Sequence, residues 1–405
     1  MSGRSKAGSG IHESGTADRH ALGFGFGNFL GIMSGTADIT SFSGSYAPAE
    51  VTFLLRCLQL ETTSLEQREQ RIQCGRQHYS EMIGPEDAPS RERLRLFREC
   101  LGINGRRMAT DIATLADAMI ASATGGELTL VSIARAGTPV GVLLLHRLRR
   151  KAPHLSVSHY SISVIRDRGA DLTALRWIME RHSPASLRFI DGWTGKGTIA
   201  GELRRSLSAW KDVPEGLDPG LWVPLDVCGV ASFAASSQDY LIPSTLLGGT
   251  ISGLISRSVL PRGEEDRLHG CVLLHHLRRH DLSRWFIQKL VFEMDCLPLG
   301  ISPPPNVSGG PDRHAQAMHC LAETMTRYGI ADANRVKLGI GETVRVLLRR
   351  LPQVVCLRED SPAADSQMIR RLASLRDVPV EFVHGLAFDA LAVIASAGKK
   401  PLLLE

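Results

Sequence analysis

Short apolar runs alternate with amphipathic segments along the middle of the chain, and this alternation constrains the fold more than any other feature. The apolar runs predict buried strands and the segments between them predict helices, in turn over residues 127–134, 139–150, 159–165, 171–182, 186–192, 197–210 and 221–227. Short connections of this kind are typical of a parallel sheet with helices on both faces. The sequence therefore predicts an α/β fold, with ligands bound in the loops after the strands.

The flanking sequence indicates how the chain divides. Charged, Leu-rich stretches predict helices over residues 64–83 and 90–122, whereas residues 50–60 fit a strand or a helix equally well. A Pro/Gly/Ser cluster at residues 300–313 indicates a linker, and a smaller βα pattern follows it. We expect a disordered leader, a large α/β domain, a linker with one helix and a small α/β domain, over residues 1–40, 41–299, 300–330 and 331–405.

Composition excludes several classes of protein. The eight cysteines include no CxxC pair, which argues against a zinc knuckle and against a secreted disulfide framework. We interpret them as mostly buried thiols of a cytoplasmic protein. The net charge of +5 does not by itself indicate nucleic-acid binding. No apolar run reaches the roughly 18 residues of a membrane span, and the N-terminal sequence does not fit a signal peptide.

The stretch DGWTGKGT, residues 191–198, has the composition of a phosphate-binding loop. A Walker A loop needs GxxxxGK followed by Ser or Thr, but Gly197 follows Lys196 here, so that spacing fails. The dinucleotide fingerprint GxGxxG fails too, because Ala200 takes the place of its third glycine.

The same stretch resembles the ribose-phosphate loop of type I phosphoribosyltransferases, in which a strand ends in acids and a loop of small residues opens a helix. The resemblance implies that Asp191 holds ribose hydroxyls, although many of those enzymes have two adjacent acids there. It also implies a phosphate cradle made of Thr194, Gly195, Lys196, Gly197 and Thr198. The alternative is a Gly-rich connection that binds nothing.

A second loop, ARAGTP, resembles the pyrophosphate loop of the same enzymes. The resemblance implies that Arg135 contacts pyrophosphate oxygens and that Gly137 admits the anion, with Ala134 and Ala136 as the small residues around them. Mg²⁺ is expected with such a ligand, held through Asp191 rather than by a protein-only metal site. The alternative is a turn with a solvated arginine.

Further side chains could close over the ligand or hold its nucleophilic partner. Arg166 and Arg168, after the second strand, and Ser252 and Arg257, later in the domain, are the candidates. Arg166 and Arg168 fit a surface salt-bridge cluster equally well. Trp285 could stack on a base, although a tryptophan there more often packs in the core.

Several segments, including GSYAPAEVTFLL, GRQHYSEM, VSIARAGTPVGVLL, FIDGWTGKG and HDLSRWF, together resemble the bacterial StiP family. This family is associated with tellurite-resistance and stress gene clusters, and the resemblance covers roughly residues 43–295. The family is described both as phosphoribosyltransferase-like and as a cysteine protease. A protease needs a thiolate paired with a histidine. Cys228 is the candidate nucleophile, and a buried structural thiol is the alternative.

Residues 335–395 resemble the Pelota (L7Ae-like) RNA-binding fold, in which a Gly-rich turn opens a helix that holds bent RNA. Lys337, Gly339, Glu342 and Arg345 fall on that motif, and Gly341 replaces the usual asparagine. Protein docking or dimerisation is the alternative role for this module.

From these resemblances we expect a type I phosphoribosyltransferase-like domain followed by a Pelota-like domain. The first hypothesis is Mg²⁺-dependent transfer of a ribosyl phosphate or diphosphate in stress-related, nucleotide-like metabolism. One alternative is an RNA-binding regulator whose degenerate transferase domain senses a nucleotide. Another is a StiP-type cysteine protease. The expected partners are a ribosyl phosphate or nucleotide-like molecule and RNA, without a membrane.

Overall fold

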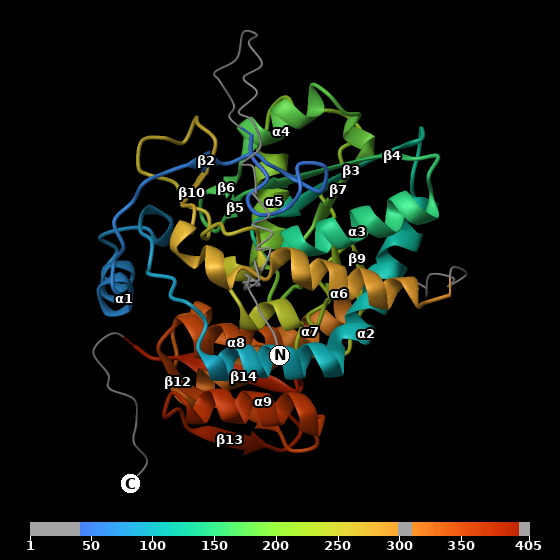
Figure 1. Cartoon of the computed structure of the whole chain (residues 1–405). Coiled ribbons are helices and arrows are strands. Elements are labelled where there is room, and N and C mark those ends of the chain that lie inside the picture. The colour runs from blue at the N-terminus through green and yellow to red at the C-terminus, as the bar shows by residue number, and fades with distance from the viewer. Residues whose placement is uncertain (1–40, 299–309, 397–405) are drawn as a thin grey trace, which may run out of the picture.

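The computed structural model describes residues 41–298 and 310–396. The expected leader at residues 1–40 and most of the expected linker, residues 300–309, lie outside the described residues. Figure 1 shows a large α/β domain with a small C-terminal domain, in orange and red, packed beneath it.

A six-stranded parallel sheet forms the centre of the large domain, in the order β1-β4-β3-β7-β8-β9. The parallel α/β prediction is confirmed. The strands are β1 (Thr52–Phe53), β3 (Glu127–Ile133), β4 (Ser156–Ile162), β7 (Leu187–Ile190), β8 (Leu221–Leu225) and β9 (Phe233–Ser236). From β3 the chain crosses to β4 on one side and then returns to β7 on the other. The loops after β3 and β7 therefore lie next to each other at the reversal point.

Helices cover both faces of the sheet, as predicted. The helices of the large domain are α1 (Leu65–Gln73), α2 (Arg91–Ala121), α3 (Gly137–Lys151), α4 (Leu172–Met179), α5 (Thr198–Ser208) and α6 (Ser283–Asp295). One buried cluster contains side chains of α2, α3 and α6, and a second contains those of α4 and α5. Capping side chains fix the starts of two helices, since Ser90 accepts the Arg93 N–H at α2 and Asp171 accepts the Ala174 N–H at α4.

Two expected elements differ from the structure. The helix expected over residues 64–83 ends at Gln73, because Gly75 adopts a positive φ of 66° and turns the chain. The strand expected over residues 159–165 breaks after Ile162. Its last residues form β5 (Val164–Ile165), which pairs with β6 (Gly169–Ala170) in a separate hairpin.

The segment of residues 50–60 becomes two short strands rather than a helix. Its first strand, β1, extends the central sheet, and its second, β2 (Arg56–Cys57), pairs in parallel with β10 (Gly270–Cys271). This second pairing brings Cys57 directly opposite Cys271.

The C-terminal domain holds a four-stranded sheet in the order β11-β14-β12-β13. Its elements are α7 (Gly310–Tyr328), β11 (Val336–Leu338), α8 (Ile340–Arg349), β12 (Pro352–Arg358), α9 (Ala363–Ser374), β13 (Val380–Val383) and β14 (Ala390–Ile394). Its apolar residues belong to the same buried cluster as α2 and α3, so the two domains share one core.

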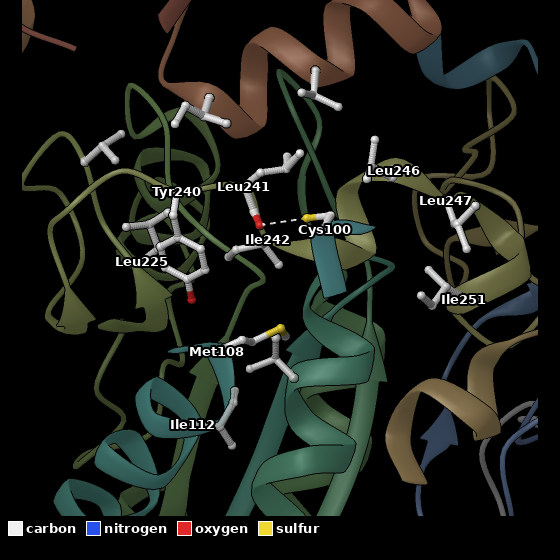
Figure 2. Close-up of a cluster of buried hydrophobic side chains, with 14 of the residues drawn as sticks. Cys100, Met108, Ile112, Leu225, Tyr240, Leu241, Ile242, Leu246, Leu247 and Ile251 are labelled. Carbon is white, nitrogen blue, oxygen red and sulfur yellow. Dashed lines mark hydrogen bonds between the residues drawn. The ribbon is translucent and has the colours of Figure 1, made fainter. Parts of the chain in front are cut away.

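The long helix α2 is central to this shared core. Figure 2 shows Met108 and Ile112 of α2 facing Tyr240 and Ile242, and the Cys100 thiol donating to the carbonyl of Leu241 at 3.3 Å. Nearby, the side-chain amide of Asn104 donates to Asp365 of α9 at 2.9 Å. Polar and apolar contacts of α2 thus hold the two domains together.

Candidate functional site

A cavity of about 530 Å³ opens where the loops after β3 and β7 face helix α8 of the C-terminal domain. We call it the basic cavity. It is lined by Arg135, by the loop of residues 191–198, by parts of the segment of residues 68–93, by Arg257 and by residues of β11 and α8. Both domains therefore contribute walls, and Arg135 and the loop of residues 191–198, both singled out from the sequence, meet there.

The loop of residues 191–198 is held to the neighbouring strand. The N–H of Thr194 donates to the carbonyl of Leu225 at 3.0 Å, and its hydroxyl donates to Asp226 at 2.6 Å. The Thr194 hydroxyl is thus already bonded to protein. Gly197 caps α5 with a positive φ of 85°, and a Cβ there would lie 2.9 Å from Val230.

Asp226 organises this loop, and the sequence analysis missed it. Its buried carboxylate accepts the N–H groups of Cys228, Val230 and Ala231 as well as the Thr194 hydroxyl. The sequence offered one signal for Asp226, namely its place at the end of the strand predicted over residues 221–227. Its hydrogen bonds show that it fixes the turn after β8.

Two ionisable groups of the loop are perturbed by burial. Burial raises the pKa of Asp191 to about 7, although its carboxylate accepts the Gly192 N–H at 2.7 Å. Burial and the nearby Lys337 lower the pKa of Lys196 to about 8. The ammonium of Lys196 donates to the carbonyl of Ala333, which precedes β11 in the C-terminal domain.

The loop after β3 is packed rather than open. A Cβ on Gly137 would lie 2.4 Å from the carbonyl oxygen of Ile190, so this glycine allows the close approach of α3 to β7. Ala134, Ala136 and Gly137 are absent from the cavity lining among the described residues. Arg135 does line it, and its guanidinium pairs with Glu86 at 2.5 Å and donates to the Ile255 carbonyl at 2.8 Å.

Of the four side chains expected to close over the ligand or hold its partner, two line the basic cavity and two do not. Arg166 and Arg257 line the basic cavity next to the Tyr79 ring, with their guanidinium carbons 5.0 and 5.3 Å from its centroid. Arg168 is instead paired with Glu81 at 2.9 Å, and Ser252 is buried away from the cavity. Trp285 lies on α6 and packs against Phe97 of α2.

The residues that fall on the Pelota motif face the large domain. Lys337, Glu342 and Arg345 line the basic cavity. Gly339, with a φ of 90°, lies beside it, where a Cβ would be 3.2 Å from Val227. A Cβ on Gly341 would lie 3.1 Å from the indole nitrogen of Trp193. A side chain at position 341 would therefore press on Trp193 of the large domain.

Within residues 41–298 and 310–396, no group of three or more His, Cys, Asp or Glu side chains is arranged to hold a metal ion. Mg²⁺ binding through Asp191 stays a prediction. None of the described helices is long and apolar enough to cross a membrane.

The cysteines are all free thiols, five of them buried and three exposed. Cys228 is fully buried, and burial together with Asp226 and Asp239 raises its thiol pKa. The exposed Cys57 differs, because the thiol of Cys271, directly opposite in the strand pair, lowers its pKa. This second thiol was not singled out by the sequence analysis, since the pairing of β2 with β10 creates it.

Comparison with known proteins decides the family. Residues 44–291 match the model described as "Tellurite-like stress resistance cysteine protease StiP". The chain belongs to the StiP family. A relative from Acinetobacter baylyi (strain ATCC 33305 / BD413 / ADP1), named "Cysteine protease StiP", is 38% identical over 383 residues, which cover 88% of this chain and 95% of that protein. Residues 315–396 match the "PELOTA RNA binding domain" model, and no solved structure matches the chain.

These matches confirm the StiP and Pelota resemblances and correct the first functional hypothesis. Family and relative both carry the name of a cysteine protease, so assignment as a phosphoribosyltransferase was wrong. The type I phosphoribosyltransferase-like fold is not supported beyond a parallel α/β sheet. A strand followed by an acid and a Gly-rich loop suggested a phosphoribosyltransferase. Many α/β folds place such loops at the reversal point of the sheet, so the pattern does not identify the enzyme class.

Proposed function

We propose that this chain is a StiP-type cysteine peptidase. The observation that carries the proposal is the 38% identity to a relative named "Cysteine protease StiP", which extends over 88% of the chain. Such an enzyme needs a thiol that ionises near neutral pH and is accessible to a peptide. The environments of the cysteines allow the nucleophile to be chosen.

Cys228 is a poor nucleophile in this structure. It is buried, its pKa is raised, and its N–H is bound by Asp226 as part of the turn after β8. A protonated thiol with no access to solvent does not attack a peptide carbonyl. These observations favour a structural role for Cys228.

Cys57 has the environment that nucleophilic chemistry requires. It is exposed and lies opposite Cys271 in the parallel pair of β2 and β10. Their proximity lowers the pKa of the Cys57 thiol and raises that of the buried Cys271. We therefore choose Cys57, the exposed member of the pair, as the nucleophile.

A histidine accompanies this pair. His269 lies directly before β10, and its backbone carbonyl accepts the N–H of Arg56 in β2 at 2.9 Å. Burial lowers the pKa of His269 to about 4, so its imidazole is neutral at pH 7, and its Nδ1 is bonded to the Ser163 hydroxyl at 2.8 Å. In the proposed reaction, the Cys57 sulfur forms a thioester as the peptide C–N bond breaks. The leaving amine takes up a proton from water, and a further water then hydrolyses the thioester, which releases the carboxylate product and frees Cys57.

The test is cleavage of a quenched fluorescent peptide library by purified full-length variants. We expect Cys57→Ser to abolish cleavage, Cys271→Ser to slow it, and Cys228→Ala to leave it unchanged. Cys74→Ser is the matched control, because Cys74 is also exposed but lies at the end of α1. Full cleavage by Cys57→Ser would refute the choice of Cys57, and loss only in Cys228→Ala would assign the reaction to Cys228.

RNA binding is a second proposed activity, favoured by the match of residues 315–396 to the Pelota model. Because Lys337 and Arg345 line the basic cavity, an RNA that contacts them must reach between the domains. A salt slope of RNA binding that is the same in wild type and Arg345→Ala would argue against this surface. The free thiols support a cytoplasmic location for both activities.

A further inference from the structure

The basic cavity carries an excess of positive charge. Its lining includes ten Lys and Arg residues but only five Asp and Glu residues. Three of the five carboxylates are already in ion pairs, namely Glu69 with Arg350 at 2.6 Å, Glu86 with Arg135 at 2.5 Å and Glu342 with Arg345 at 2.6 Å. A fourth, Asp191, has a pKa raised to about 7 and is only partly ionised at neutral pH.

Arg166 pairs with Asp167 at 3.0 Å, but four other cations of the lining are held by backbone carbonyls rather than by carboxylates. Arg349 donates to the carbonyl of Leu247 at 3.1 Å, and Arg93 donates to that of Leu246 at 2.6 Å. Arg257 donates to the carbonyls of Tyr79 and Met82, and Lys196 to that of Ala333. A carbonyl orients a cation but does not neutralise its charge.

Two observations indicate that these cations lack a counter-ion. The Nη1 atom of Arg257 is buried and has no hydrogen-bond partner within the described part of the chain. Burial also lowers the pKa values of Arg257, Lys196, Lys337 and Arg349, which means that the folded protein disfavours their charged forms. Buried charges without partners are costly, and a bound anion would remove that cost.

Backbone groups point to the chemistry of the anion. The eleven-residue helix α5 begins at Thr198 against the cavity, after a loop with glycine at positions 195 and 197. Unpaired N–H groups at a helix start favour a tetrahedral oxyanion. Guanidinium groups bind phosphate oxygens in pairs, and several of them suit an anion with more than one charge.

We propose that the basic cavity binds a compact polyphosphate group between the two domains. Lys196, Arg257 and the start of α5 hold it from the large domain, and Lys337 and Arg349 hold it from the C-terminal domain. The group is either a free small molecule or the 5′ end of an RNA, since both present the same oxygens. This binding is independent of the peptidase proposal, because neither Cys57 nor Cys271 lines the cavity.

Calorimetry on the full-length protein tests the proposal, with inorganic tripolyphosphate as the probe, in the presence and absence of Mg²⁺. We expect saturable binding and a higher melting temperature. Arg257→Gln and Arg349→Gln should each weaken binding roughly tenfold or more, as expected for a lost charge-assisted contact. Lys196→Gln provides a third variant in case either arginine substitution prevents folding. Arg204→Gln, an exposed arginine on α5, should bind like wild type.

The RNA arm compares one oligonucleotide with a 5′-triphosphate or a 5′-hydroxyl. Tighter binding of the triphosphate form than of free tripolyphosphate would support an RNA end, whereas equal affinity would support a small molecule. Two results would overturn the proposal: no binding of any phosphate probe at millimolar concentration, or equal binding by Arg204→Gln and all three cavity variants. Tighter binding of an acidic peptide than of tripolyphosphate would overturn the phosphate assignment. Cys57→Ser should bind tripolyphosphate normally, so failure of the peptidase proposal can be distinguished from failure of the phosphate-binding proposal.

Discussion

The indole nitrogen of Trp193 donates a hydrogen bond to Oε1 of Glu342 at 3.3 Å, across the boundary between the two domains. Trp193 belongs to the loop after β7, and Glu342 lies in the first turn of α8. Arg345 pairs with the same oxygen of Glu342 at 2.6 Å and lies 5.6 Å from the centroid of the Trp193 ring. This loop of the large domain is thereby fixed against the helix that forms the opposite wall of the basic cavity.

Asparagine at position 341 should disrupt this contact. Because a Cβ at Gly341 already reaches 3.1 Å from the indole nitrogen, Gly341→Asn must displace Trp193. We expect a loss of about 1–3 kcal/mol in the free energy of unfolding, measured by urea denaturation. Gly201→Ala is the control, since no atom lies within 4 Å of its Cβ, and it should be stabilising by roughly 0.5–1 kcal/mol. Unchanged stability of Gly341→Asn would mean that the indole moves freely.

Asp226 should be important for the stability of the large domain. Asp226→Asn replaces one accepting oxygen by an amide donor, which leaves the N–H groups of Val230 and Ala231 or of Cys228 without an acceptor. We expect a loss of about 3 kcal/mol in the free energy of unfolding. The exposed Asp212→Asn should change stability by less than about 0.5 kcal/mol. A similar effect of both substitutions would show that the turn does not depend on this carboxylate.

Asp191 should make stability depend on pH. Its folded pKa of about 7 lies above the ordinary value of 3.8, so the folded state holds this proton more tightly than the unfolded state. Raising the pH from about 4 to 7 therefore favours unfolding. Asp191→Asn removes this effect and can still accept the Gly192 N–H. We expect it to be more stable than wild type at pH 8, by on the order of 2 kcal/mol, and equal to wild type at pH 4.

Urea denaturation of both proteins at the two pH values measures this difference. Asp212→Asn at the same pH values reports the effect of removing an exposed carboxylate. An Asp191→Asn variant that is less stable than wild type at pH 8 would show that the Asp191 carboxylate is ionised and paired in the folded protein.

Cys57 should be the most reactive thiol of the folded protein. The neighbouring Cys271 thiol lowers its pKa, so a larger fraction is thiolate at pH 7. We expect mass spectrometry to find Cys57 alkylated by iodoacetamide several-fold faster than the exposed Cys74, and the difference to shrink in Cys271→Ser. Equal rates at both cysteines in wild type would argue against a stabilised thiolate.

The parallel sheet was predictable because apolar strands and amphipathic helices alternate with short connections. The positions of Asp191 and Lys196 followed from the loop after β7. Only part of the lining of the basic cavity was predictable. Arg349 reaches the cavity because α8 packs against the large domain, and local sequence carries no signal of that packing. The Cys57–Cys271 pair was hidden for the same reason, because a pairing between strands more than 200 residues apart creates it.

The order of strands in the C-terminal sheet bears on how the protein is made. Strand β14 (Ala390–Ile394) lies between β11 and β12, so β11 has its hydrogen-bonded neighbour only when residues 390–394 are present. During synthesis, β11 leaves the ribosome about 50 residues ahead of this strand. Lys337 on β11 therefore takes its place in the wall of the cavity late, and a nascent chain presents the large domain without a completed cavity.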